Sequence, residues 1–331
     1  MTKQRRPLTV CIALAAFLIA AFFSLRFGSS SMSWKAFLGG LLQKEGYETE
    51  TIILCSLRLP RMLAGVFAGA GLALSGSLLQ RATDNALAAP SVLGINAGAG
   101  FAVILFLSLF PTLHELLPFA AFVGALASAG CILGVSGKIG LGKTTVVLTG
   151  VALSALFQAG ISFFSVLDED VLASYTDFSV GGLRGVTMED LLVPAPMIAL
   201  CLLGALCMAR PLNLFCLGDT MASSLGVSVK RTRLLALLLS AASAAAAVSF
   251  AGLLGFVGLI VPHAARKIAA NDARGEILLS ALCGGTLLLF ADLLGRVLFT
   301  PTEIPVGIFT AVLGVPFFLW LLLQRRYRAS I

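Results

Sequence analysis

Residues 234–265 read LLALLLSAASAAAAVSFAGLLGFVGLIVPHAA, a run of 32 residues without an Asp, Glu, Lys or Arg. A helix needs about 20 mostly apolar residues to cross a bilayer, so this stretch is long enough for one crossing and part of a second. Gly252, Gly255 and Gly258 interrupt its second half, where glycine favours a turn over a continuous helix. The stretch therefore predicts one full membrane-spanning helix followed by one short helix.

The rest of the chain has the same character. Of its 331 residues, 58% are hydrophobic and only 12% are charged, and the mean hydropathy is +1.00. Soluble domains carry roughly twice this fraction of charged residues, so the composition excludes a water-soluble enzyme. Disordered chains are poor in Leu, Val, Ile and Phe, and this chain is rich in them. The composition predicts an all-α polytopic membrane protein.

Charge-free windows of about membrane length recur along the whole chain. They cover residues 7–25, 62–80, 85–114, 116–137, 144–167, 191–209, 234–265 and 304–324, and a ninth window, 277–298, is broken only by Asp292 and Arg296. Because window 234–265 holds two helices, we predict about ten transmembrane helices in a single transmembrane domain, 1–331. An even number of helices puts both termini on the same side.

Lys and Arg are distributed unequally between the two sides that this topology defines. With the N-terminus inside, 16 of the 23 cations fall in inner segments and eleven of the 16 acids in outer segments. Short cytoplasmic loops retain Lys and Arg, so both termini are predicted to be cytoplasmic. The net charge of +7 is then a sign of topology and not of nucleic-acid binding. A cleaved signal peptide stays open as an alternative for the first span, since a basic start precedes its apolar core.

Residues 137–144, GKIGLGKT, match the phosphate-binding pattern G-x-x-x-x-G-K-[ST] letter for letter. That motif works between a buried strand and a soluble helix, where backbone N–H groups surround the phosphates. Here it joins two windows of membrane length, and no acidic strand end is available to hold magnesium. We interpret it as a glycine-rich, basic cytoplasmic turn. The seven cysteines have no C-x-x-C spacing and no neighbouring His, so no metal site is predicted either.

Other features predict contacts between helices and with a partner. Gly65 with Gly69, and Gly94 with Gly98, have the G-x-x-x-G spacing that lets helix backbones approach closely. Asp292 and Arg296 lie four residues apart, on one helix face, and are interpreted as a local ion pair. Residues 210–233 form the longest inner connection. In it we predict a short helix over 221–225, with Asp219 as N-cap and Gly226 at its end, that docks onto a cytoplasmic partner or lies on the lipid surface.

Five stretches, in this order along the chain, resemble one known family. They are RLPR at 58–61; LAAP at 87–90; LGD at 217–219 with Ala222 and LG at 225–226; GFVGLIVPH at 255–263; and ADLLGR at 291–296 with PVG at 305–307 and GVPFF at 314–318. Together they are similar to the permease subunits of ABC importers for iron-siderophores, haem and cobalamin, the FecCD-like type II importers. The resemblance covers residues 58–318.

The resemblance implies a non-catalytic permease with the type II ABC importer fold in a bacterial cytoplasmic (inner) membrane. Two copies would form a homodimer around the translocation path. Two cytoplasmic ATPase subunits would bind ATP and Mg, for which this chain has no site, and an extracytoplasmic solute-binding protein would deliver the solute. No nucleic acid is implied.

The resemblance also assigns residues to three sites. Binding-protein docking falls to Arg58, Arg61 and Arg296; ATPase coupling, in a segment of about 214–229, to Leu217, Gly218, Asp219, Ala222, Leu225 and Gly226; and the cytoplasmic gate to Asn85, Leu87, Lys143 and Thr144. The gate departs from the family pattern, which has Arg-Asn-Pro-Leu where residues 84–87 read DNAL, and Asp in place of Ala89.

We expect import of an iron-siderophore or a related metal chelate such as haem or cobalamin, and the sequence does not choose among them. Two other classes stay open. In an ion-coupled secondary transporter, Asp292 would be the coupling site. In a structural membrane scaffold, a change such as Leu225→Arg would leave transport untouched.

Overall fold

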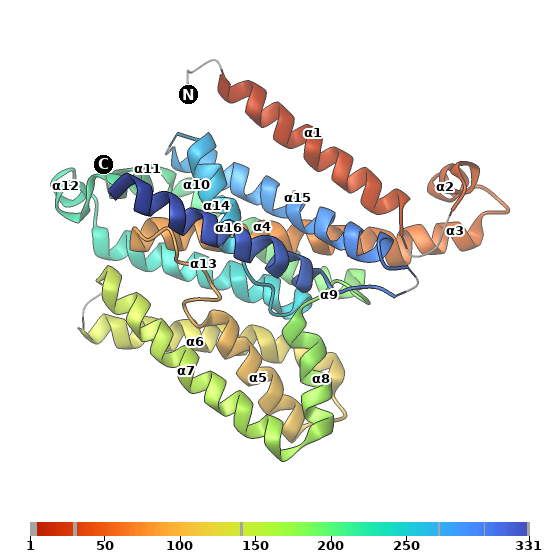
Figure 1. Cartoon of the computed structure of the whole chain (residues 1–331), viewed down its shortest axis with the longest axis horizontal. Coiled ribbons are helices and arrows are strands. Elements are labelled where there is room, and N and C mark those ends of the chain that lie inside the picture. The colour runs from red at the N-terminus through yellow and green to blue at the C-terminus, as the bar shows by residue number, and fades with distance from the viewer. Residues whose placement is uncertain (1–4, 29–31, 140–141, 271, 301, 330–331) are drawn as a thin grey trace.

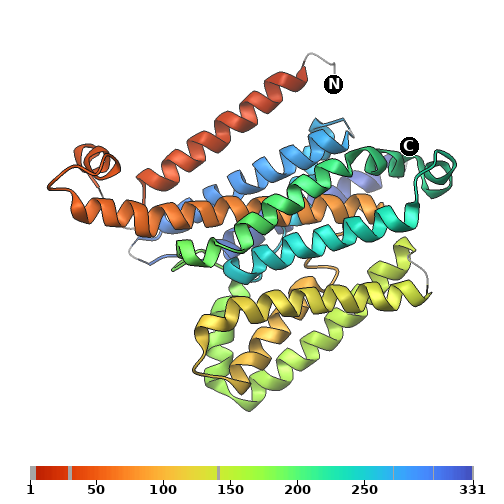
Figure 2. The same cartoon turned by 180° about the vertical axis from the view of Figure 1, so that it is seen from behind.

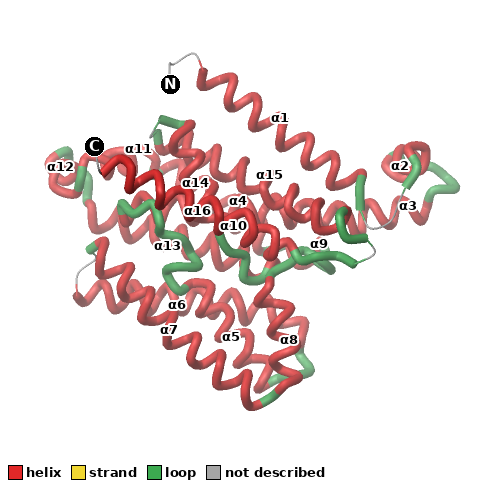
Figure 3. The backbone as a smooth tube through the Cα atoms, in the orientation of Figure 1, coloured by secondary structure: helices red, strands yellow, loops and turns green. Residues whose placement is uncertain are grey.

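The computed structural model describes residues 5–28, 32–139, 142–270, 272–300 and 302–329, and every regular element in these residues is a helix (Figures 1 and 3). The helices of the first half are α1 (Arg5–Arg26), α2 (Trp34–Leu41), α3 (Glu48–Ile52), the π-helix η1 (Ile53–Arg58), α4 (Leu59–Thr83), α5 (Ile95–Leu109), η2 (His114–Leu116), α6 (Leu117–Ile139) and α7 (Lys143–Leu167). The second half contains α8 (Glu169–Val180), α9 (Met188–Leu191), α10 (Pro194–Cys207), α11 (Ala209–Leu214), η3 (Phe215–Leu217), α12 (Asp219–Ser224), α13 (Val229–Ala251), α14 (Val257–Ile268), α15 (Ala273–Val297) and α16 (Val306–Ala329).

Seven helices within the described residues are long and apolar enough to cross a membrane. Shorter apolar helices occupy Ile95–Leu109 and Val306–Leu319, and α14 has only 12 residues. Each window that the sequence marks out holds a helix. The membrane-spanning, all-helical class is confirmed, whereas the count of about ten spans stays a prediction.

The apolar stretch 234–265 divides as predicted into a long helix and a short one. α13 ends at Ala251, and α14 begins at Val257. Gly252 between them has a φ of +71°, and a Cβ there would meet the Phe178 carbonyl oxygen. The break therefore requires glycine for two reasons, backbone conformation and space.

α4 lies at the centre of the helix bundle, in contact with α13, α14 and α15. α1 packs on the far side of α15, and α10 packs against α13. Helices α5, α6, α7 and α8 form a second layer, which α13 joins to the first (Figures 1 and 2). This arrangement buries α4 on all sides, in agreement with the many buried residues along its length.

Small residues bring these helices together, as the glycine spacing predicts. A Cβ at Gly69 would meet the Gly284 carbonyl oxygen, and one at Gly76 would meet that of Gly258. The close backbones are joined by side-chain hydrogen bonds, such as the one from Ser243 Oγ to the Gly71 carbonyl oxygen at 2.9 Å. Packing and hydrogen bonds of this kind hold helices together where lipid gives no hydrophobic drive between them.

The start of α1, the end of α16 and α12 all lie at one end of the bundle, and α2 and α3 lie at the other (Figures 1 and 2). We call the first the inner end and the second the outer end, after the predicted topology.

Candidate functional site

The outer end contains a cluster of charged side chains centred on Asp292, which is only 3% exposed. Arg61 of α4 donates from Nε and Nη2 to Asp292 Oδ1 at 3.0 and 2.9 Å. Its Nη1 donates to Glu303 Oε2 at 2.8 Å. Arg296 Nε lies 2.9 Å from Asp292 Oδ2, which confirms the predicted i,i+4 pair. The contact with Arg61 is the one that the sequence did not indicate. Both oxygens of Asp292 are therefore engaged by arginines.

Arg58 and Arg296 satisfy the carbonyl groups at the end of α1. Arg58 Nη1 donates to the carbonyl oxygens of Leu25 and Arg26 at 2.9 and 2.7 Å. Arg296 donates to the carbonyl oxygen of Phe27 at 3.2 Å and to Ser24 Oγ at 2.9 Å. The last carbonyls of a helix have no partner within it, so these two guanidinium groups act as its cap.

This placement bears on the predicted docking residues. Arg58 and Arg296 are 5% and 3% exposed, so in this structure they face the protein interior rather than a partner. The Arg61 side chain is 15% exposed. Docking by these three arginines stays a prediction, and the structure gives Arg58 and Arg296 an internal role. Arg184 is an exposed cation nearby, which the sequence analysis did not single out.

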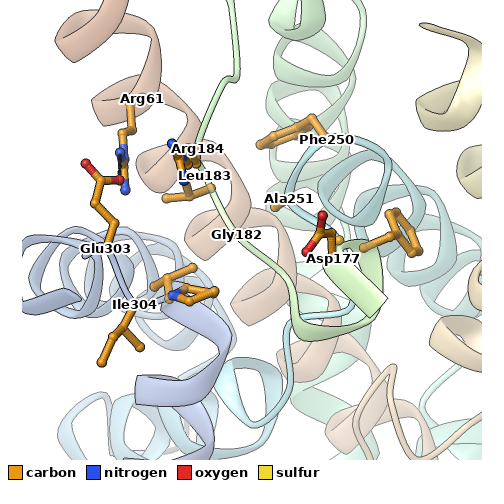
Figure 4. A pocket seen from close by; sticks show the side chains of 13 residues that line it. Arg61, Asp177, Gly182, Leu183, Arg184, Phe250, Ala251, Glu303 and Ile304 are labelled. Carbon is orange, nitrogen blue, oxygen red and sulfur yellow. Dashed lines mark hydrogen bonds and ion pairs between the residues drawn. The ribbon is translucent and has the colours of Figure 1, made fainter. Parts of the chain in front are cut away.

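A cavity of about 360 Å³ opens beside this cluster at the outer end (Figure 4). Arg61 and Glu303 lie on one side of it, and Asp177 of α8 lies on another (Figure 4). Arg184 and the backbone of the loop after α8 complete its wall. A cavity lined by both signs of charge and by the apolar side chain of Phe250 is suited to a solute with polar and apolar parts.

The predicted gate residues lie on two loops that the structure brings together. α4 ends at Thr83, and Asp84 follows in a left-handed conformation with a φ of +49°. Lys143 Nζ, at the start of α7, lies 3.0 Å from Asp84 Oδ2. The side chains are 33% and 66% exposed, so the pair is worth at most about 1 kcal/mol. The acid that stands where the family pattern has Arg is thus matched by a lysine across the gap.

For the other gate positions the structure gives the local surroundings, and their role in the gate stays a prediction. Asn85 Oδ1 accepts from the Leu87 backbone N–H at 3.0 Å, which closes a local turn. Thr144 is exposed. Ala89, at the second departure from the family pattern, is 2% exposed, so it takes a small apolar residue in a buried position. Of the phosphate-loop pattern, residues 140–141 lie outside the described residues, and helices α6 and α7 flank them.

The predicted coupling segment contains the short helix α12, but its cap differs from the prediction. Gly218, with a φ of +88°, is the N-cap, and Asp219 is the first helical residue. The predicted N-cap role of Asp219 is wrong because its carboxylate instead accepts from Arg233 Nη2 at 2.9 and 2.8 Å. At the other end, Gly226 N–H donates to the Ser223 carbonyl oxygen and Val227 N–H to that of Ala222. These two bonds form a Schellman motif, so the predicted stop at Gly226 is confirmed.

The coupling segment presents apolar side chains at the inner end. Leu217, Met221 and Leu225 are 57%, 59% and 57% exposed, whereas Ala222 is fully buried. Met221 lies in α12 and Leu225 is its C-cap, four residues later, so these two share one side of the helix. Leu217 is the last residue of η3, and Gly218 separates it from α12. The buried Ala222 anchors α12 to the rest of the protein. Met221 is an exposed residue that the assigned set missed, although its spacing of four from Leu225 was visible in the sequence.

A buried ion cluster beneath this segment was not predicted. Glu276 of α15 is 0% exposed. Its carboxylate accepts from Arg81 Nη2 at 2.7 Å, from Arg266 Nε at 2.9 Å and from Ser77 Oγ at 2.9 Å. Arg81 Nη1 also donates to the Leu212 carbonyl oxygen at 3.4 Å, so the cluster connects α11 to the centre of the bundle. The sequence shows only charges at the ends of apolar windows and gives no sign that they meet.

Comparison with known proteins assigns the chain to a family. The model of the FecCD transport family matches residues 16–324. The chain belongs to the FecCD transport family. It is 36% identical over 323 residues to the Fe(3+)-citrate import system permease protein YfmE of Bacillus subtilis, covering 97% of this chain and 96% of that protein. It is 38% identical to the hemin transport system permease protein HmuU of Yersinia pestis, over 96% of each chain.

The fold of this FecCD protein also matches a solved structure, described as an inward-facing conformation of a metal-chelate type ABC transporter. The TM-score is 0.85 at 29% identity, over 96% of this chain and 99% of that one. The resemblance to permeases of the iron-siderophore, haem and cobalamin importers is therefore confirmed, and so is the transport class. The names of the relatives describe permeases, which are transport components and not catalytic enzymes.

Proposed function

We propose that this FecCD protein is the membrane-spanning subunit of an ATP-driven importer of an iron chelate. The observation that carries the proposal is the exposure of three apolar side chains in and beside the short inner-end helix α12: Leu217, Met221 and Leu225. Exposed apolar residues at the cytoplasmic end of a membrane protein need a partner, and an ATPase subunit of an ABC importer supplies one. The names of the relatives, which concern Fe(3+)-citrate and hemin, support an iron chelate as solute.

The proposed complex contains two copies of this chain, two cytoplasmic ATPase subunits and an extracytoplasmic solute-binding protein. ATP and Mg would be held by the ATPase subunits in the cytoplasm, on the side of both termini of the permease. Arg61 and the exposed Arg184 would face acidic side chains of the binding protein, with orientation set by charge-assisted pairs. Arg58 and Arg296 would shape that surface by fixing the end of α1, and would engage the partner directly only if α1 moves.

Transport would proceed by coupled motion of the two ends. Closure of the ATPase subunits would displace the coupling segment, and the gate loops that carry Asn85, Leu87, Lys143 and Thr144 would open or close the path in response. A gate held by one exposed ion pair is suited to this, because the pair costs little to break. The solute would enter through the mixed-charge cavity at the outer end and would not be bound tightly on the way.

The test is uptake by proteoliposomes that contain the permease, its ATPase subunits and the binding protein, with iron(III) citrate, haem and cobalamin as solutes. We expect uptake that requires ATP inside and binding protein outside. Leu225→Arg should abolish ATP-driven uptake and co-purification of the ATPase subunits, because it places a charge in an apolar contact. Leu42→Arg is the matched control, since Leu42 is 63% exposed but lies beyond α2 at the outer end; it should keep co-purification intact.

The proposal fails if uptake runs on an ion gradient without ATP, or if Leu225→Arg leaves uptake unchanged. The first result would favour the secondary transporter and the second the scaffold. The ion-driven alternative is not favoured, because both oxygens of Asp292 are engaged by arginines and the residue is 3% exposed. A coupling carboxylate has to exchange its ion with water.

A further inference from the structure

Arg233, in the second turn of α13, is buried and contacts elements from three parts of the chain. Its residue exposure is 4%. Its Nη2 donates to both carboxylate oxygens of Asp219, at 2.9 and 2.8 Å. Its Nε donates to the carbonyl oxygen of Ala82 at 2.9 Å, and its guanidinium carbon lies 5.6 Å from the centre of the Phe215 ring. One rigid, planar group therefore holds several partners at fixed positions.

These partners lie at the start of the two segments that have to act together. Asp219 is the first residue of α12, the helix that carries the exposed Met221 and has Leu225 as its C-cap. Ala82 is the second-last residue of α4, and the gate loop begins directly after this helix at Asp84. The guanidinium of Arg233 therefore connects the coupling helix to the end of α4, from which the gate loop begins.

The connection continues from this loop to the second one. Asp84, two residues beyond Ala82, pairs with Lys143 at the start of α7. A continuous chain of contacts thus runs from Asp219 through one guanidinium to the end of α4, and from there to the contact between the two loops. In the first link the arginine is buried and bonds to both oxygens of Asp219, although the Asp219 side chain is 43% exposed. In the last link both side chains are partly exposed and joined by one ion pair, so this contact is the weaker of the two.

We infer that Arg233 is a positioning residue that couples displacement of α12 to the gate loops. This inference rests on the proposed function, because it requires an ATPase partner that moves α12. It goes beyond that function by naming the side chain that transmits the motion.

The first test variant, Arg233→Lys, is designed to keep the contact with Asp219 and to remove the contact with the Ala82 carbonyl oxygen. A lysine keeps the charge and can pair with Asp219, but it lacks the planar fork that also reaches the Ala82 carbonyl oxygen. Arg231→Lys, two residues earlier on the same helix, is the matched control because Arg231 is exposed. Asp219→Asn is a second variant, which keeps the Ala82 contact and removes the ion pair from the other side.

Two readouts are taken on the whole importer in lipid, with ATP and vanadate used to trap the closed ATPase. The first is solute taken up per ATP hydrolysed. The second is hydrogen exchange of two segments, 84–91 at the gate and 218–227 at the coupling helix. In the wild type and in Arg231→Lys, trapping should change exchange in both segments.

In Arg233→Lys and Asp219→Asn, we expect uptake per ATP to fall about tenfold, within the usual range of coupling between sites. Exchange should still respond in 218–227 and should no longer respond in 84–91. A purely structural role would not separate these two responses.

The inference is overturned if both segments respond in Arg233→Lys and Asp219→Asn as they do in the wild type. It is also overturned if these variants lose the ATPase subunits, since Arg233 would then only build the docking surface. The proposed function is judged separately, from the wild-type complex alone: absence of ATP-driven uptake there refutes the importer, whatever the variants do.

Discussion

Asp292→Asn tests whether the charged cluster at the outer end stabilises the fold, as a structural joint between helices, or binds a transported ion. The change keeps the size of the side chain and removes its negative charge. The carboxylate that it replaces is 3% exposed and holds Arg61 on one oxygen and Arg296 on the other. The substitution therefore leaves two positive groups facing a neutral amide, one of them as deeply buried as Asp292 itself.

The expected loss follows from the partners that remain. Removing one member of a buried ion pair costs about 3–5 kcal/mol. Arg296 keeps its hydrogen bonds to Ser24 Oγ and to carbonyls at the end of α1, and Arg61 keeps Glu303. These contacts reduce the expected loss to about 2–3 kcal/mol. Glu303→Gln is the matched control, because a glutamine keeps an acceptor oxygen for Arg61 and Arg61 also keeps Asp292, so the change should cost only about 1 kcal/mol.

Unfolding by SDS in mixed micelles, followed by tryptophan fluorescence, measures the free energy of unfolding of both variants. Trp34 reports on this corner, since the Arg26 guanidinium lies 4.5 Å from the centre of its ring. The chain has two tryptophans, so a Trp320→Phe background isolates the signal. A loss below about 0.5 kcal/mol for Asp292→Asn, or one equal to that of Glu303→Gln, would refute the structural joint. Unchanged stability with loss of ion-driven uptake would instead support an ion site.

Two further predictions concern packing and the gate. Gly76→Ala should lower the free energy of unfolding by about 2–3 kcal/mol or more, because its Cβ would meet the backbone of Gly258, which cannot move aside. Gly130→Ala in the same assay should be neutral or stabilising by up to about 1 kcal/mol, since open space surrounds that position, and equal effects of the two changes would contradict the close approach of α4 and α14. Lys143→Met should cost less than about 1 kcal/mol of stability because its pair with Asp84 is exposed. The same SDS titration measures this free energy of unfolding. A loss above about 2 kcal/mol would show that the Lys143–Asp84 pair stabilises the fold strongly, which contradicts a pair that is easily broken.

Glycine spacing and hydropathy were enough to predict much of the fold. Partition into lipid depends on each stretch of about 20 residues by itself, so the windows and the break after Ala251 could be read directly from the chain. The Gly69 contact was also predictable, since close helix approach needs small residues at fixed spacing. The Asp292–Arg296 pair was predictable for the same reason, because four residues on a helix are always one turn.

The role of Asp219 depends on a tertiary contact that its neighbours in the sequence do not indicate. An Asp before a short apolar helix usually caps it, and the sequence offers no competing partner nearby. In the folded chain, Arg233 lies against it and takes the carboxylate, and Gly218 caps the helix instead. A charge-assisted hydrogen bond to a buried guanidinium is stronger than a capping bond, so the tertiary contact decides.

The sequence by itself determined that this protein is a helical membrane permease and which family it resembles, because these properties follow from composition and from short motifs. The direction in which its charges face stays a prediction from the distribution of Lys and Arg. Only the tertiary structure decided that Arg61 meets Asp292 across 231 positions and that Arg81 meets Glu276 across 195. The physical reason is that a charge buried in a bundle needs an opposite charge in space, wherever the chain supplies it. The same need joins Arg233 to Asp219 and thereby ties the coupling helix to the gate.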